Sequence, residues 1–134
     1  MIGNLSGDVL EAMMETLPVE FSVVDENDNV LAWNKHDTRI FKRPEVVVGR
    51  NVRDCHPQKS VDNVLTILTE MKEGKREKAR FWIDLGEGDA GRKVMIEYYA
   101  LRSPAGKYLG CLEASQDITD IRKIEGQKRI LEQE

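Results

Sequence analysis

The sequence predicts an α+β fold, in which a five-stranded antiparallel sheet carries helices on one face. Three apolar runs in the second half of the chain are separated by turn segments that contain Gly, which is typical of an antiparallel meander. Two shorter runs flank the Asp- and Asn-rich segment 25–29, and this pattern predicts a hairpin. Strands and helices occur in runs and do not alternate, which favours α+β over a parallel α/β architecture.

The first half of the chain begins with an amphipathic pattern. The elements expected there are a helix at 6–17, strands at 21–24 and 30–33, and a short helix around 35–42. Ser6 is suited to cap the first helix, and Pro18 follows its end. Asn34 is suited to cap the second helix. Residues 44–57 are interrupted by Pro and Gly, so only short helical turns are expected in them.

A longer helix and three strands are expected in the second half. The helix is centred on 61–71, with Ser60 at its N-cap and Gly74 just after its end. The strands are expected at 77–85, 92–102 and 107–116. Their apolar residues occur at both alternating positions, so both faces of the sheet are expected to be covered. The predicted organisation is an N-terminal helix at 1–17, a core at 18–117 and a C-terminal helix at 118–134.

Composition and motifs argue against several functional classes. The chain has 134 residues, of which 40% are hydrophobic and 33% charged, as is ordinary for one globular domain. The net charge of −4 gives no reason to expect nucleic acid or an anionic membrane as partner. No apolar run reaches the roughly 20 residues of a membrane span. The two cysteines suggest no disulfide framework, so we expect a reducing, cytoplasmic setting. No catalytic motif stands out, and we expect no enzymatic activity.

Three local motifs, in the order in which they occur, resemble those of the PAS domain family. Asn34 resembles the helix-capping asparagine of that family, and Val-Gly-Arg at 48–50 resembles its glycine turn. Asp117, Ile118 and Thr119 resemble the signature at the end of its last strand. The resemblance covers about residues 17–121. It implies a sensory module of signal transduction in which this signature transmits the signal.

A narrower resemblance is carried by three segments. Cys-His-Pro at 55–57, Phe-Trp-Ile at 81–83, and the run at 112–119 with its Glu-x-x-Gln-Asp-Ile-Thr pattern are similar to one PAS subgroup. In that subgroup the PAS module often follows a hemerythrin-like domain. This sequence has no such helical bundle ahead of its PAS-like region, so the resemblance implies a stand-alone version or an excised piece.

The resemblance also implies an internal cavity for a small ligand. In the flavin-binding PAS branch, the residue two before the signature Asp points into the cavity, which here is Ser115. Strand alternation then adds Glu113 and Cys111, whereas the opposite register would expose Glu113. The further cavity candidates are Cys55, His56, Leu68, Met71, Phe81, Ile83, Val94, Ile96 and Tyr98. A plain core without ligand is the alternative, although a buried Glu113 would then need a partner.

The sequence does not decide whether the domain binds a cofactor, and haem, a metal ion and flavin are considered in turn. Some PAS sensors bind haem through a histidine in the middle region, so His56 is a candidate haem ligand. A simpler interpretation is that His56 helps to start the long helix by hydrogen bonding. The spacing of Cys55, His56 and Cys111 resembles no known metal site. Flavin photochemistry is not expected, because Val52 stands where the light-sensing branch carries its reactive cysteine.

The C-terminal segment indicates how such a module would act. Four residues follow the 3–4–3 spacing of a coiled-coil seam: Ile121, Ile124, Lys128 and Leu131. Gly126 and the charge of Lys128 weaken the pattern. We expect a homodimer, with a helix after Thr119 that passes the state of the cavity to an unidentified output partner. The alternatives are a ligand-free dimerisation domain and a haem or metal sensor that uses His56.

Overall fold

The computed structural model describes residues 2–34, 40–41, 48–54, 58–86 and 91–132. Five strands form one antiparallel sheet in the order β2-β1-β5-β4-β3, which confirms the predicted α+β class. The strands are β1 (Glu20–Asp25), β2 (Val30–Trp33), β3 (Lys78–Leu85), β4 (Arg92–Arg102) and β5 (Tyr108–Asp117). Their bounds agree closely with the predicted strands, because turn residues mark the ends of each apolar run.

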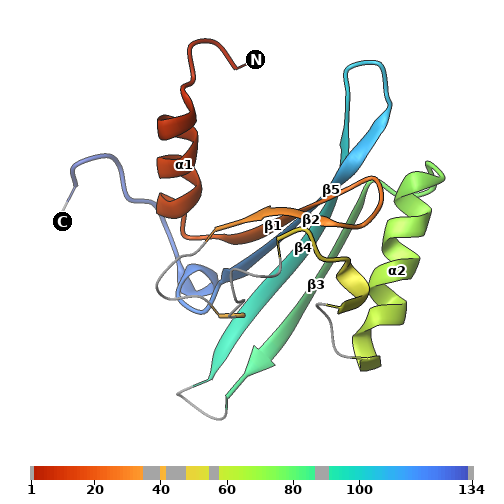
Figure 1. Ribbon diagram of the computed structural model, residues 1–134. Helices are drawn as coiled ribbons and strands as arrows, with labels where there is room; N and C mark the ends of the chain where they lie inside the picture. The colour runs from red at the N-terminus through yellow and green to blue at the C-terminus, as the bar shows by residue number, and fades with distance from the viewer. Residues whose placement is uncertain (1, 35–39, 42–47, 55–57, 87–90, 133–134) are drawn as a thin grey trace.

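A helix covers one face of the sheet, which we call the inner face. Helix α2 (Gln58–Lys72) lies beside the sheet (Figure 1) and buries Val64, Leu68 and Met71. These apolar residues recur at helical spacing, so they form one stripe. They pack against the 3-10 helix η2 (Val52–Asp54) and against strand residues that include Val24, Val30, Val94, Ile96, Tyr98 and Cys111. The burial of this apolar surface is the main term that stabilises the domain.

Helix α2 ends at the glycine that the sequence predicts. Gly74 has a φ of +76°, and its N–H donates to the carbonyl of Met71 at 3.2 Å. The N–H of Lys75 donates to the carbonyl of Glu70 at 2.8 Å. Together these two bonds form a Schellman motif, which satisfies carbonyl groups at the helix end and requires the left-handed glycine.

The start of α2 differs from the prediction. The helix begins at Gln58, so Ser60 lies within its first turn and not at the N-cap. Gln and Lys are good helix formers, and they extend the helix beyond the apolar stripe on which the prediction relied. Near the other end, the Lys72 Nζ lies 2.7 Å from the buried carboxylate of Asp28. This ion pair joins α2 to the turn between β1 and β2.

Helix α1 (Gly7–Thr16) extends away from the sheet ahead of β1 (Figure 1). Ser6 caps it as predicted, because the Ser6 hydroxyl accepts a hydrogen bond from the Val9 N–H at 3.2 Å. No residue of α1 is buried. Its apolar stripe is between 46% and 50% exposed at Val9, Leu10, Met13 and Leu17. The helix therefore contributes little to the core of its own chain.

The second face of the sheet, which we call the outer face, is also apolar. Phe21, Val23, Met95 and Leu112 are only partly buried there, and Trp82 is exposed. Within the described residues, α2 packs on the inner face and α1 has no buried residue, so this chain leaves the outer face largely open.

The predicted C-terminal helix is wrong over the part of 118–134 that the structure describes. A 3-10 turn, η4 (Ile121–Lys123), follows β5, and Ile124 is then extended, with φ −66° and ψ 130°. Gly126 has a φ of +65°, which interrupts a right-handed helix. The apolar residues of the segment are exposed. Without packing, a helix of this length is marginal in water.

Some expectations lie outside the described residues. These are the helix at 35–42, of which only residues 40–41 are described, and part of the turns at 44–57. In the described ranges, none of the helices has both the length and the apolar character that crossing a membrane requires.

Candidate functional site

Strand β1 turns Glu20 and Ser22 toward the core together with Val24, and it turns Phe21 and Val23 toward the outer face. Glu20 and Ser22 are 7% and 5% exposed, whereas Phe21 and Val23 are only partly buried. Hydrophobic alternation alone would predict the reverse orientation. Buried polar groups cost free energy unless they are paired, so these side chains need hydrogen-bond partners on the inner face.

Strand β5 continues the polar surface of β1. The strand register pairs Glu20 with Ser115 and Ser22 with Glu113. We call Glu20, Ser22, Glu113 and Ser115 the polar quartet. Ser115 is 3% exposed, and Cys111 is buried on the same side of the strand. Of the two registers that the sequence left open, β5 therefore adopts the one that turns Cys111 and Ser115 inward.

Glu20 anchors a segment that is distant from it in the sequence. Its carboxylate accepts hydrogen bonds from the backbone N–H groups of Ile40 and Phe41, the latter at 3.1 Å. Charge-assisted bonds of this kind offset part of the cost of burying a carboxylate. Glu20 is not among the predicted site residues, and the signal available in the sequence was an acidic residue at the start of an apolar strand.

A small cavity lies at the other half of the polar quartet. Its volume is about 20 Å³, which is sufficient for about one water molecule. Four residues predicted from the sequence line it: Leu68, Tyr98, Cys111 and Glu113. The lining residues that the sequence analysis missed are Ser22, Val24, Val30, Val52 and Val64. Assigning Ser22 and Val24 requires the pairing of β1 with β5, which no local pattern reveals, and the other three residues lie on β2, η2 and α2.

Other predicted cavity residues are part of the core. Met71, Val94 and Ile96 are buried in the apolar cluster and do not belong to the described lining of the cavity. Cys55 and His56, the predicted haem ligand, lie outside the described residues. Among the residues that the structure does describe, no three His, Cys, Asp or Glu side chains form a group that could hold a metal ion.

Phe81 does not line an enclosed cavity. It lies on the edge strand β3 and is 39% exposed. Its ring stacks on that of Tyr98, with the ring centroids 6.0 Å apart. Ile83 lies on the same side of β3 and is partly buried against the core. Alternation assigned both side chains to the correct face, but it could not show that β3 is the edge of the sheet.

The Cys111 thiol is chemically unreactive in this environment. Burial raises the pKa of Cys111 to about 12, and the charge of Glu113 acts in the same direction. A neutral thiol is a weak nucleophile and a poor metal ligand. Cys111 therefore acts as a small apolar side chain in the core.

Asp117, Ile118 and Thr119 fasten the end of β5 to the start of β4. The Asp117 carboxylate accepts hydrogen bonds from the N–H and the hydroxyl of Thr119, at 2.9 and 2.6 Å, and these bonds lower the pKa of Asp117. The Thr119 hydroxyl oxygen accepts from the N–H of Lys93 at 2.9 Å. The Ile118 N–H donates to the carbonyl of Lys93 at 2.8 Å. The segment that leaves the sheet is thus bound to two strands.

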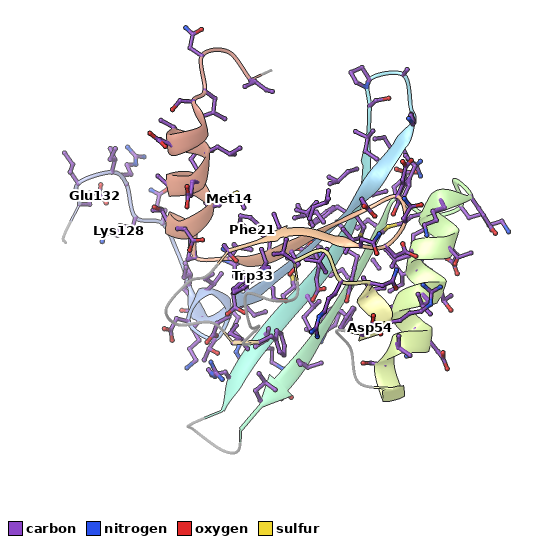
Figure 2. All side chains as sticks on the ribbon, viewed as in Figure 1. Met14, Phe21, Trp33, Asp54, Lys128 and Glu132 are labelled. Carbon is purple, nitrogen blue, oxygen red and sulfur yellow. The ribbon has the colours of Figure 1, made fainter. Side chains whose placement is uncertain are left out.

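Asn34 joins α1 to the sheet. Its Oδ1 accepts a hydrogen bond from the Phe21 N–H at 2.9 Å. Its Nδ2 donates to the carbonyls of Met14 and Val19, at 2.9 and 2.7 Å. Figure 2 shows Met14 on α1 and Phe21 on β1, the two elements that Asn34 connects. The predicted helix cap concerns residues 35–42, which lie largely outside the described part of the chain.

The fold and these connections agree with a known family. Residues 10–119 match the family model of the PAS domain. The chain therefore belongs to the PAS domain family. A search of the curated proteins finds no match.

Solved structures include similar domains from several bacteria. The C-terminal domain of a protein from Streptococcus mutans is 32% identical, with a TM-score of 0.81, and the match covers 92% of this chain and 94% of that one. A PAS domain from Colwellia psychrerythraea is 15% identical, with a TM-score of 0.60 and coverage of 84% and 96%. A sensory box sensor histidine kinase from Vibrio cholerae is 16% identical, with a TM-score of 0.56 and coverage of 83% and 90%.

Proposed function

We propose that this chain is a non-enzymatic sensory module of signal transduction that binds a small ligand on the inner face of its sheet. The polar quartet is the observation that carries the proposal, because its four side chains stand where an ordinary core would be apolar. Moving polar side chains from water into a core costs free energy that hydrogen bonds offset only in part. The similar sensory box structure from Vibrio cholerae supports a sensory role.

The signal would leave the domain through Asp117, Ile118 and Thr119. A ligand that contacts Glu113 or Ser115 acts on β5 directly, and the hydrogen bonds to Lys93 connect the end of β5 to β4. The ligand must prefer one of two arrangements of these strands, since equal affinity for both would shift nothing. The apolar residues after Thr119 are exposed, so they are available for contact with an output partner.

We also propose a homodimer in which α1 takes part. Its stripe of Val9, Leu10, Met13 and Leu17 is half exposed in this chain. The outer face of the sheet offers a second apolar surface of the same kind. Apolar stripes of this kind on a helix are normally buried, so their exposure here indicates contact with another chain.

A different observation favours the alternative of a ligand-free interaction domain. The cavity at Ser22 and Glu113 has a volume of only about 20 Å³. Pockets for drug-sized ligands measure about 300–1,000 Å³, so this cavity holds a water molecule and no larger ligand without movement of its walls. In this alternative the apolar stripe of α1 would be the functional surface.

We also propose that the chain belongs to the narrower PAS subgroup, in which the module often follows a hemerythrin-like domain. We further propose a cytoplasmic location. The subgroup is supported by the residues at 55–57, 81–83 and 112–119. A reducing location is supported by Cys111, which is buried as a free thiol.

Thermal unfolding with a broad panel of metabolites tests ligand binding. A ligand is expected to raise the Tm of the wild-type chain, and Glu113→Gln should reduce this shift because it removes a charge from the inner face. Glu125→Gln is the matched control, since Glu125 is exposed and lies beyond η4. An absorption spectrum of the purified chain reports haem or flavin in the same sample. If no compound raises the Tm and the spectrum is colourless, the interaction domain is the better description.

A further inference from the structure

A second, larger hollow lies at the Glu20–Ser115 half of the polar quartet. Its volume is about 260 Å³, and the described residues that line it are Pro18, Val19, Glu20, Ile40, Arg92, Ser115 and Asp117. The volume is slightly below the range of drug-sized pockets, so it suits a small metabolite. The lining comes from the start of β1, the start of β4 and the end of β5.

Two polar side chains in this hollow retain free hydrogen-bonding capacity. No ion pair or hydrogen bond joins the Arg92 guanidinium or the Ser115 hydroxyl to another residue in the described part of the chain. Ser115 is nevertheless 97% buried, because its exposed fraction is 3%. The Ser115 hydroxyl is not among the described polar atoms that are fully buried without a partner, so it reaches the open space of the hollow and is available to a ligand there.

Two carboxylates in the described lining of the hollow are already engaged. Glu20 accepts from the N–H groups of Ile40 and Phe41, and Asp117 accepts from Thr119. The Arg92 guanidinium lies in the same hollow, and its charge helps to hold the pKa of Asp117 below its ordinary value. The described lining therefore presents groups of both charge signs, which a ligand with one charge of each sign would match.

We propose that this hollow binds a small zwitterion with an apolar body, such as an apolar amino acid. This proposal rests on the proposed sensory function. The ligand carboxylate would bind the Arg92 guanidinium and the Ser115 hydroxyl. The ligand ammonium would face Glu20 and Asp117. The apolar body would lie against Pro18, Val19 and Ile40.

This site would also explain how a ligand reaches the output segment. Asp117 both lines the hollow and binds Thr119. Pro18 and Val19 lie between α1 and β1, and the Val19 carbonyl accepts from Asn34. A ligand in the hollow would therefore contact both the segment that joins α1 to β1 and the residue that binds Thr119 at the end of β5.

The test begins with thermal unfolding of the full chain in the presence of each of the twenty amino acids. The best amino acid is then compared by calorimetry with its deaminated acid and its decarboxylated amine. For leucine these are 4-methylpentanoate and 3-methylbutylamine. We expect the amino acid to bind at least tenfold more tightly than either analogue. Arg92→Gln should weaken its binding at least tenfold, and Ser115→Ala should weaken it severalfold.

Lys107→Gln is the matched control, because it removes one positive charge at the opposite end of β4, in an exposed turn. It should leave the affinity unchanged. Equal binding of all three compounds, or an affinity that Arg92→Gln does not change, would overturn the proposal. Binding of another ligand class that is sensitive to Glu113→Gln would overturn it while the sensory function stands. If no amino acid and no other metabolite binds, both fail.

Discussion

Gly110 shows how a single residue permits the pairing of β1 with β5. A Cβ at this position would lie 2.0 Å from the backbone oxygen of Val24, and the φ of Gly110 is +153°. The Val24 oxygen belongs to the backbone of a central strand, so it cannot move without disturbing the sheet. A side chain at position 110 is therefore incompatible with the inner-face register that forms the polar quartet.

We expect Gly110→Ala to lower the free energy of unfolding by roughly 2–4 kcal/mol, from steric overlap and backbone strain. Urea unfolding of the purified variant measures this loss. Gly106→Ala is the control: its φ of +89° is also strained, but its Cβ would have nothing within 4 Å. The control should lose only about 1 kcal/mol. Equal losses in the two variants would contradict the steric argument.

Cys111 predicts a pH dependence of stability. Its pKa is raised to about 12 in the folded chain, from an ordinary value of 9.0. Below about pH 9 both the folded and the unfolded states keep the proton. At higher pH the unfolded state loses it while the folded state retains it, so stability falls as pH rises. Between pH 8 and 10 this loss is on the order of 1–2 kcal/mol.

The measurement is urea unfolding at pH 8, 9 and 10 in a Cys55→Ser background, where Cys111 is the remaining thiol. Cys111→Ala in the same background should show a smaller decline of stability with pH, because its unfolded state has no thiol to titrate. The comparison concerns the slopes and not the absolute stabilities, since the alanine also leaves a small cavity. Identical slopes would show that the thiol titrates normally in the folded chain.

Among the elements, α1 depends on Asn34 for its place. Asn34→Ala removes the partners of the Phe21 N–H and of the Met14 and Val19 carbonyls. We expect stability to fall by roughly 2–4 kcal/mol, because these groups lose their hydrogen bonds. Hydrogen exchange should accelerate most at the base of α1 and the start of β1. Asn63→Ala, at an exposed position of α2, should change neither quantity. Uniform acceleration across the sheet would argue against a local role.

The elements that the sequence predicts well are those with a strong local pattern. The strands β3, β4 and β5 are bounded by turn residues, and α2 has an apolar stripe and a glycine at its end. The site is less predictable, because it depends on pairing between distant strands. The polar quartet joins β1 to β5, and alternation in β1 alone points the wrong residues inward. The C-terminal helix was wrong because its heptad pattern has no packing partner in this chain.

For the whole molecule, the two faces of the sheet differ in polarity along β1 and β5. The inner face holds the polar quartet between β1 and β5, whereas the outer face holds Phe21, Val23 and Leu112 on the same two strands. Polar residues inside and apolar residues outside would be unfavourable for an isolated monomer. A ligand inside and a second copy outside would each remove one of these costs. Ligand binding and dimerisation would then act on the same pair of strands.

A dimer through α1 gives the last prediction. The chain has a mass of 15.3 kDa, and sedimentation velocity should show twice this value at micromolar concentration. Met13→Lys places a charge in the exposed apolar stripe, and we expect the dimer dissociation constant to rise at least tenfold. Thermal stability at high dilution should hardly change, because no residue of α1 is buried in its own chain. Glu11→Gln changes the charge of α1 by the same amount outside the apolar stripe and should leave the dimer intact. A monomeric wild-type chain, or a dimer that survives Met13→Lys, would show that α1 serves another partner.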